Sequence, residues 1–411
     1  MIFLEDILQK KLHVDAKYFL RGGLWGTLGQ MAVVIGGVVT SIIFTHILTE
    51  PAYGVYRYLI SLCGLISAFS LTGLGISILQ ATSNNKQIYN DSIKIGFTYS
   101  LFISLLALAV SCYYYLNGNL TLAVGCILIA TLQPIINTFS NTSAYLQGNK
   151  KYKEAATFQV YRTSIVSAVS ILTVLITQDI ITLFLAYLTS HLVINTFSHL
   201  YHRPISKKEN LEEVGGVYFK HAKHTSVRNI MSHVALRIDN IILFTHVGAS
   251  ELAVYFVANL IPEQLKASIK QLFVLILPKY TKHTNLASIR KNIPRRCIQL
   301  LFILSIISIA YIIAAPYIFS LILPKYPEAI FFSQLLALSF PPLILILPLG
   351  ALQSQLKERA LYYLNIYGAI TSIILSVTLI LLFGVLGAVI AKITARYVRL
   401  GLAMYYLYSN N

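Results

Sequence analysis

Long runs of apolar residues recur along the whole chain, and short polar segments separate them. Each run has about 20 residues, the length that a helix needs to cross roughly 30 Å of hydrocarbon. None of the runs alternates polar and apolar residues in segments of about ten, as the strands of membrane barrels do. The pattern therefore predicts an all-α integral membrane protein with about 12 transmembrane helices. These helices are predicted to begin near Leu24, Val55, Ile93, Leu120, Phe158, Ile180, Thr225, Ala253, Ile298, Ile330, Leu361 and Val385.

The positions of the basic residues predict how the helices are oriented. An even number of spans puts both termini on one side of the membrane. Of the Lys and Arg residues in connections, 22 fall on the side of the termini and only Arg57 and Lys325 fall on the other side. Because Lys and Arg are enriched in cytoplasmic connections, we expect the N- and C-termini to be cytoplasmic.

Composition excludes a soluble protein and argues against an enzyme. The 411 residues are 56% hydrophobic and 11% charged, whereas about 25% of residues are charged in an average soluble domain. The longest polar segment, about 201–224, is too short for a catalytic domain. The four cysteines are widely separated, so no disulfide framework or zinc site is indicated. We expect no catalytic residues, no metal and no cofactor, and a function performed inside the membrane.

Two matches between the halves of the chain indicate a duplicated unit. The tripeptide Phe-Thr-His occurs at 44–46 and again at 244–246. A second match aligns QPIINTFSNTSAYLQGNKK, from Gln133, with PPLILILPLGALQSQLKER, from Pro341. A duplicated six-helix unit gives two parallel lobes, predicted at 1–205 and 206–411. Transporters with this arrangement bind substrate between the lobes, near the membrane midplane. Chance similarity between helix ends is the alternative.

Three segments of the chain resemble one family of membrane proteins. Residues 17–80 contain a first helix rich in small residues and a Leu-x-x-x-x-Tyr-Gly-x-Tyr turn that begins at Leu48. AYLQGNKKYKEA, at 144–155, looks like the cytoplasmic end of the family's fourth helix, and residues 237–262 look like its seventh and eighth helices. The chain thus resembles Wzx-type O-antigen and polysaccharide flippases of the multidrug/oligosaccharidyl-lipid/polysaccharide (MOP) exporter superfamily.

This resemblance implies a MATE-like fold and a transport function. The implied substrate is an undecaprenyl-diphosphate-linked oligosaccharide, a repeat unit of O-antigen, capsule or exopolysaccharide. It would move from the inner to the outer leaflet of the bacterial cytoplasmic (inner) membrane by alternating access. The implied partners are this lipid-linked glycan, membrane lipids and other membrane proteins of polysaccharide assembly, and no nucleic acid.

Charged residues inside the predicted helices are the candidate functional residues. A charge at the bilayer centre costs about 2.5–3.5 kcal/mol on insertion scales, so such residues usually face a cavity or a partner. Cations suit this substrate because Arg binds phosphate oxygens bidentately and Lys adds a mobile charge. The candidates for a cationic, substrate-binding lumen are Arg237, Lys266, Lys270, Lys392, Arg396 and Arg399. The candidates for coupling transport to a proton or sodium gradient are Asp239 and Glu263.

Two alternatives remain open for these charges. Glu263, Lys266 and Lys270 share one helix face, so they either line a water-filled cavity or form internal pairs that lock the helix. The last helix either crosses the bilayer from about Val385 to Tyr408, or it ends early and RYVRLGLAMYYLYS, from Arg396, lies flat at the inner interface.

Other functions remain open as well. Cation-coupled multidrug efflux uses the same fold, but cationic drugs favour an acidic cavity. A membrane polysaccharide polymerase or ligase needs a large outer loop, and the predicted outer connections are short.

Overall fold

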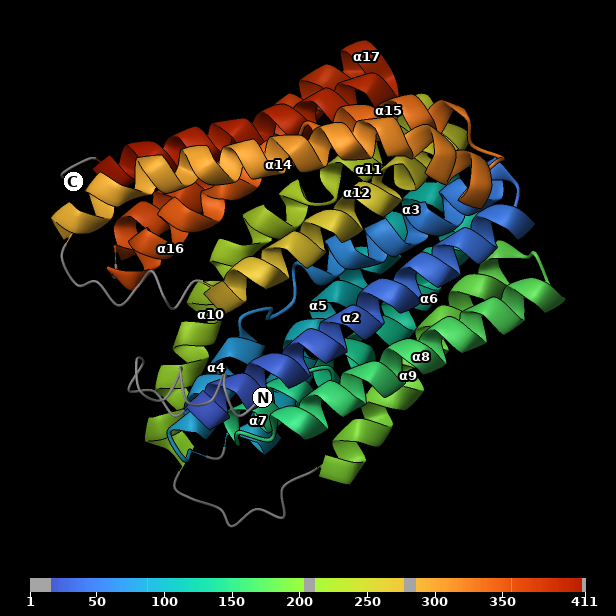
Figure 1. Ribbon diagram of the computed structural model, residues 1–411. Coiled ribbons are helices and arrows are strands. Elements are labelled where there is room, and N and C mark those ends of the chain that lie inside the picture. Colours follow the sequence, from blue (N-terminus) through green and yellow to red (C-terminus); the bar gives the residue numbers. More distant parts are fainter. Residues whose placement is uncertain (1–15, 87, 203–210, 277–285, 356, 409–411) are drawn as a thin grey trace. The chain divides into compact units, whose positions relative to one another are not determined.

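The computed structural model describes residues 16–86, 88–202, 211–276, 286–355 and 357–408. These residues fold into helices and no strands (Figure 1), which confirms the predicted all-α class for the described part of the chain. Residues 1–15 and residues 203–210, which are part of the polar segment at about 201–224, lie outside the described residues. Contacts divide the chain into two compact units, 1–40 with 66–229 and 41–65 with 230–411.

The first unit is built mainly of long helix pairs joined by tight turns. Asn119 accepts a hydrogen bond from the N–H of Leu122 and so caps α6, and Gly118 has φ of 75° in the turn before it. Its helices are α2 (Ala16–Ile47, up to Thr40), α4 (Leu74–Ser83), α5 (Tyr89–Leu116), α6 (Leu120–Phe139), α7 (Thr142–Gly148), α8 (Tyr152–Ile176), α9 (Ile180–His202) and α10 (Leu211–Ala235, up to Asn229).

The second unit contains the end of α2, all but the last two residues of α3 and most of the C-terminal half. Its helices after α2 are α3 (Glu50–Ser67), the end of α10 from Ile230, α11 (Ile238–Ile242), the π-helix η1 (Leu243–Val247), α12 (Ala249–Ile276), α14 (Leu286–Ile322), α15 (Glu328–Ala337), the 3₁₀-helix η2 (Pro341–Leu345), α16 (Ile346–Ser354) and α17 (Glu358–Tyr408). The boundary predicted at residue 205 stays a prediction, because these contact units and the duplicated halves are different divisions of the chain.

Helix α17 is a hairpin of two antiparallel arms rather than one straight helix. Gly384 has φ of 57° and ψ of −130°, which breaks the 51-residue helix near its middle. A Cβ on Gly387 would lie 1.8 Å from the carbonyl oxygen of Leu379, so the arms are in contact beside the turn. The second arm continues as a helix to Tyr408. This geometry favours a last helix that crosses the membrane over a segment that lies flat on it.

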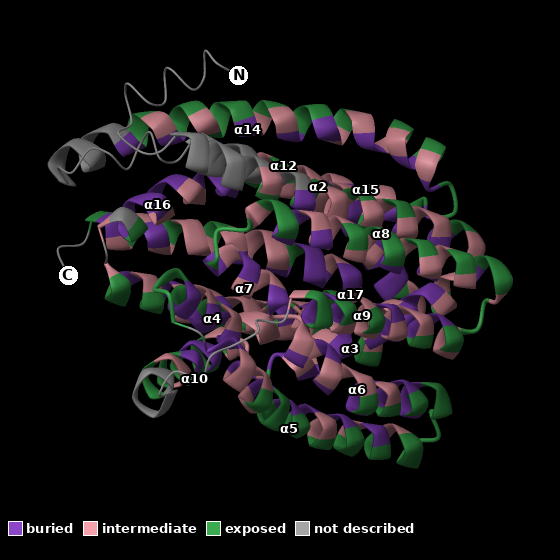
Figure 2. Cartoon of the chain, turned by 90° about the horizontal axis from the view of Figure 1, so that it is seen from below, coloured by how far each residue is buried: buried purple, intermediate pink, exposed green. Residues whose placement is uncertain are grey.

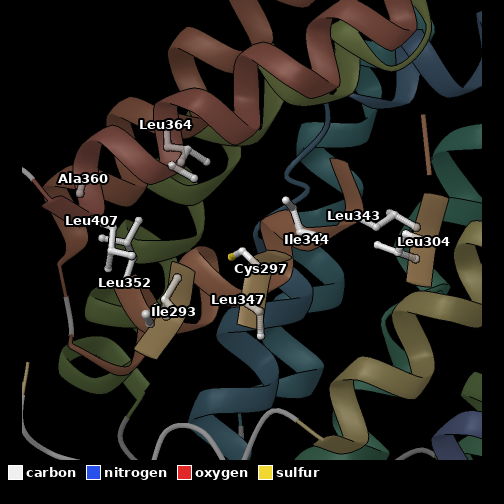
Figure 3. Close-up of a cluster of buried hydrophobic side chains, with 12 residues drawn as sticks. Ile293, Cys297, Leu304, Leu343, Ile344, Leu347, Leu352, Ala360, Leu364 and Leu407 are labelled. Atoms are coloured by element: carbon white, nitrogen blue, oxygen red, sulfur yellow. The ribbon is translucent and has the colours of Figure 1, made fainter. Parts of the chain in front are cut away.

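The outer face of α14 is apolar, as expected for a helix in lipid. Most of its exposed large side chains recur every three or four residues and therefore lie on one face of the helix (Figure 2). These are Ile298, Phe302, Ile306, Ile309, Ile313, Tyr317 and Leu321, and the exposed Leu301 and Ile303 flank them. On the opposite face, Ile293, Cys297 and Leu304 pack in a buried cluster with residues of η2, α16 and α17 (Figure 3).

Eight described helical segments are long and apolar enough to cross a membrane, which confirms a multi-pass membrane protein. Four predicted helices are interrupted in the structure, a feature that hydropathy did not show. The interruptions follow Ser67, Phe139, Ala235 and Ala337. In the last of them Pro341 and Pro342 lack backbone N–H donors, so the chain forms a 3₁₀ turn before α16 begins. The count of 12 spans and the cytoplasmic termini stay predictions.

Candidate functional site

A cavity of about 420 Å³ lies within the second unit, bordered by the end of α10, by α11 and α12 and by both arms of α17. Its charged lining residues are Asp239, Glu263, Lys392, Arg396 and Arg399. Five of the eight sequence candidates therefore meet at one cavity, although they come from three separate helices. Three cations against two carboxylates give the lining a positive balance.

Glu263 is the centre of an ion cluster on the cavity wall. Its Oε1 atom lies 2.7 Å from Nζ of Lys266, 3.0 Å from Nζ of Lys392 and 2.8 Å from Nη2 of Arg396. The i, i+3 spacing places Glu263 and Lys266 on one face of α12, and the i, i+4 spacing places Lys392 and Arg396 on one face of α17. Four candidates thus form one electrostatic unit with two more positive than negative charges.

Neutral side chains hold the cations of this cluster in place. Ser339 accepts hydrogen bonds from Nη1 of Arg396 at 2.7 Å and from Nζ of Lys266 at 3.3 Å. Asn259 accepts one from Nζ of Lys392 at 2.7 Å. Ser339 is fully buried in the interruption between α15 and η2, so the broken helix supplies the acceptor that two cations share.

Asp239 lies in a second, smaller hydrogen-bond network. The hydroxyl of Tyr255 donates to its Oδ2 at 2.6 Å, and the N–H of Asn240 donates to its Oδ1 at 2.9 Å. Nζ of Lys392 lies 5.5 Å from the centroid of the Tyr255 ring. Tyr255 therefore stands between Asp239 and the Glu263 cluster.

Arg399 extends the positive wall toward the first arm of α17. Its Nη2 donates to Oδ1 of Asn365 at 2.9 Å, and its Nε is buried without a hydrogen-bond partner among the described atoms. A Cβ on Gly368 would lie 3.5 Å from Cγ of Arg399, so the side chain crosses the adjoining arm closely at that glycine.

The remaining three candidates do not line the cavity. Lys266 is 3% exposed and lies behind Glu263. Lys270 is exposed. Arg237 packs on Gly64 of α3, where an added Cβ would lie 2.1 Å from its Nε. The charges of α12 therefore fit both predicted alternatives, cavity lining and internal pairing. Glu263 faces the cavity, and it also forms an internal pair with Lys266.

Sequence reasoning missed the neutral partners of the charges. Asn259, Asn365 and Tyr255 each form a hydrogen bond with one of the candidates, and Ser339 does so with two. Asn259 was detectable in principle, since it lies four residues before Glu263 on the same face of α12. The other three carry no periodic signal that distinguishes them from ordinary helix residues.

Comparison with known proteins identifies a matching protein family and solved structures with a similar fold. A family described as "Polysaccharide biosynthesis protein" matches residues 43–325. No protein with curated annotation matches the chain.

Solved structures of the MOP superfamily have a similar fold. The inward closed form of the lipid II flippase MurJ has a TM-score of 0.64 and 13% identity, with 94% of this chain and 87% of that chain covered. An outward-facing multidrug resistance MATE transporter has a TM-score of 0.60 and 14% identity, covering 95% and 94%. A MOP transporter from Pyrococcus furiosus, described as having a binding pocket of reverse polarity that suggests a different function, has a TM-score of 0.57 and 12% identity, covering 95% and 94%. These likenesses confirm the predicted MATE-like fold.

Proposed function

The chain belongs to the polysaccharide biosynthesis protein family and has the fold of the MOP superfamily, and from this premise we propose that it is a flippase for a lipid-linked oligosaccharide. The proposed substrate is an oligosaccharide repeat unit, of O-antigen, capsule or exopolysaccharide, on undecaprenyl diphosphate. It would cross from the inner to the outer leaflet of the bacterial cytoplasmic membrane by alternating access. Membrane lipids and other membrane proteins of polysaccharide assembly are proposed as further partners.

The observation that carries this proposal is the positive wall of the cavity. Lys392, Arg396 and Arg399 lie along one arm of α17 and all border the same space. A diphosphate offers several negatively charged oxygens, and Arg and Lys bind such oxygens with short, charge-assisted hydrogen bonds. Charged groups inside a membrane are costly unless they are used or paired. Glu263 is the single carboxylate that pairs with Lys266, Lys392 and Arg396, so the remaining positive charge at the cavity favours an anionic ligand.

The rest of the lining suits the sugar next to the diphosphate. Asn365, Ser372 and Ser376 present neutral polar side chains from the first arm of α17, and Ser232 does so from α10. A volume of about 420 Å³ lies within the range of small-molecule sites, about 300–1,000 Å³. It suits the diphosphate and an adjoining sugar better than a complete repeat unit.

Multidrug efflux is the second candidate, because MATE multidrug transporters have a similar fold. An organic cation would be repelled by Lys392, Arg396 and Arg399 unless other groups offset them. The reverse pocket polarity described for the Pyrococcus furiosus transporter supports the idea that pocket charge can vary on this fold. The basic lining therefore favours the flippase.

Coupling to a proton or sodium gradient is proposed to depend on Asp239 more than on Glu263. Glu263 is already neutralised by three cations within 3.0 Å. Asp239 accepts from one hydroxyl and one backbone N–H and faces the same cavity. A carboxylate with uncharged partners keeps its charge available for a cation.

Reconstitution in liposomes tests the proposed function. The assay follows transfer of a fluorescent diphosphate-linked lipid oligosaccharide to the opposite leaflet. A parallel assay in separate vesicles follows extrusion of an organic cation. Protein-dependent transfer of the glycan lipid supports the proposal. Extrusion of the organic cation without glycan transfer would assign the protein to drug efflux.

A further inference from the structure

Three cations converge on a single oxygen atom of Glu263. Lys266, Lys392 and Arg396 all lie within 3.0 Å of Oε1, although they come from two helices. The same three groups would converge in this way on one oxygen of a bound phosphate, because a carboxylate and a phosphate oxygen accept charge-assisted hydrogen bonds alike. Glu263 therefore occupies the position at these cations that an anionic ligand would take.

The cluster needs an anion whether or not substrate is present. Without Glu263, three positive charges would lie close together in a setting where Lys266 is 3% exposed and Ser339 is 0% exposed. Like charges repel most strongly where water is scarce, and a buried charge that has lost its partner is strongly destabilising. The serine hydroxyl supplies hydrogen bonds but no compensating charge.

Two members of the cluster can exchange partners at the cavity. Lys392 and Arg396 border it with about a quarter of each side chain exposed, and Glu263 borders it with 36% exposed. Lys266 lies behind them, where its contacts are with Glu263 and Ser339. An entering anion therefore reaches Lys392 and Arg396 from the cavity, while Glu263 has room to turn away from them.

We propose that Glu263 is an internal substitute for the substrate's phosphate, which holds the cations in the empty state and competes with the diphosphate for them. This inference rests on the proposed function and goes further, because it assigns Glu263 to substrate release rather than to ion coupling. Binding of the diphosphate displaces the carboxylate. Return of the carboxylate to the cations expels the diphosphate, so that affinity stays low enough for turnover.

The test compares the wild-type protein with Glu263→Gln, using farnesyl diphosphate as the probe and farnesol as its uncharged counterpart. Glutamine keeps the size of the side chain but cannot neutralise the cations. We expect the Kd for farnesyl diphosphate to be at least about tenfold lower in Glu263→Gln than in the wild type. The Kd for farnesol should not change. In the liposome assay the same variant should transfer glycan lipid more slowly. Glu251→Gln, at an exposed position in the first turn of α12, is the matched control and should change neither quantity.

The thermal transition gives a second readout if the variant is poorly folded. Farnesyl diphosphate should raise the Tm of Glu263→Gln more than that of the wild type, because the ligand replaces the missing anion. A folded variant that binds the probe no more tightly than the wild type would overturn the inference. So would an unfolded variant that the diphosphate does not restore. Absence of glycan transfer by the wild type would instead overturn the proposed function, and the binding comparison does not depend on that result.

Discussion

Arg399 and Asn365 join the two arms of α17 through a hydrogen bond of 2.9 Å, from Nη2 to Oδ1. This contact fixes a guanidinium at the cavity wall, and Nε of the same guanidinium has no hydrogen-bond partner among the described atoms. The asparagine therefore positions a cation that the proposed substrate would use.

Replacing Asn365 by Ala should lower substrate binding without removing a charge. A hydrogen bond to a charged group contributes about 1.5–3 kcal/mol, so we expect binding of a polyprenyl diphosphate to fall by about tenfold or more. Equilibrium binding to the purified variant measures this effect. Tyr367→Phe, which removes a hydroxyl from an exposed tyrosine of the same arm, serves as the control. Unchanged binding by Asn365→Ala would show that Arg399 does not need Asn365 to bind the diphosphate.

Gly384 should be intolerant of a side chain because of its backbone conformation. Its φ of 57° and ψ of −130° are rarely adopted by L-residues, and such strain costs on the order of 1–3 kcal/mol. Gly384→Ala should therefore lower the Tm in detergent. Gly401→Ala is the matched control, since Gly401 is helical with open space around it. That control should be neutral or stabilising by up to about 1 kcal/mol. Equal Tm values for the two variants would show that the backbone conformation of Gly384 does not require glycine.

Asp239 is expected to carry the coupling between transport and an ion gradient. Asp239→Asn keeps the size of the side chain but removes its charge, so transfer of glycan lipid should no longer respond to an imposed proton or sodium gradient. The liposome assay, run with and without each gradient, measures the response. Asp91→Asn, in the first turn of α5, is the control. A variant at Asp239 that keeps the wild-type response would exclude this residue from coupling.

Asp179 should stabilise the start of α9 in a pH-dependent way. Its Oδ2 accepts from the N–H of Thr182 at 2.8 Å and from the Thr182 hydroxyl at 2.7 Å, and these bonds lower the pKa of Asp179. Because the folded pKa is the lower one, the stabilisation is present above the unfolded pKa of about 3.9 and is lost as pH falls through the folded value. Asp179→Ala should cost about 0.5–2 kcal/mol at neutral pH, as loss of a helix cap does.

Hydrogen exchange at the first turn of α9 checks this prediction. Exchange should be faster in Asp179→Ala than in the wild type at neutral pH, and the difference should shrink in acid. A difference that stays constant through the acid range would show that the carboxylate is not the stabilising group.

The helices and most of the charged site could be predicted because each leaves a periodic signal. Apolar runs gave helix positions, and spacings of three and four placed Lys392 with Arg396 and Glu263 with Lys266 on common faces. Membrane burial also makes any charge conspicuous. The sequence thus pointed to residues that α11, α12 and α17 bring to one cavity.

The assembly of the site could not be predicted because it depends on interruptions and neutral partners. Ser339 accepts from two cations only because the helix stops after Ala337. Lys266 lies on the same helix as the lining residue Glu263, yet its side chain lies behind that residue. Arg237 directly precedes α11, which carries a lining residue, yet Arg237 packs on Gly64. Helical periodicity does not resolve which charged neighbour faces the cavity when a helix breaks beside it.

If the cations of this cavity hold the substrate's diphosphate, the rate of glycan-lipid transfer depends on Arg396, and Arg396→Gln measures that dependence. Wild-type protein, this variant and Arg359→Gln, an exposed cation at the start of α17, are reconstituted at matched levels. Arg396→Gln should transfer glycan lipid about tenfold more slowly or worse, since a hydrogen bond to a charged group contributes about 1.5–3 kcal/mol, while Arg359→Gln should transfer at the wild-type rate. Equal rates for all three proteins would show that Arg396 does not hold the diphosphate during transfer.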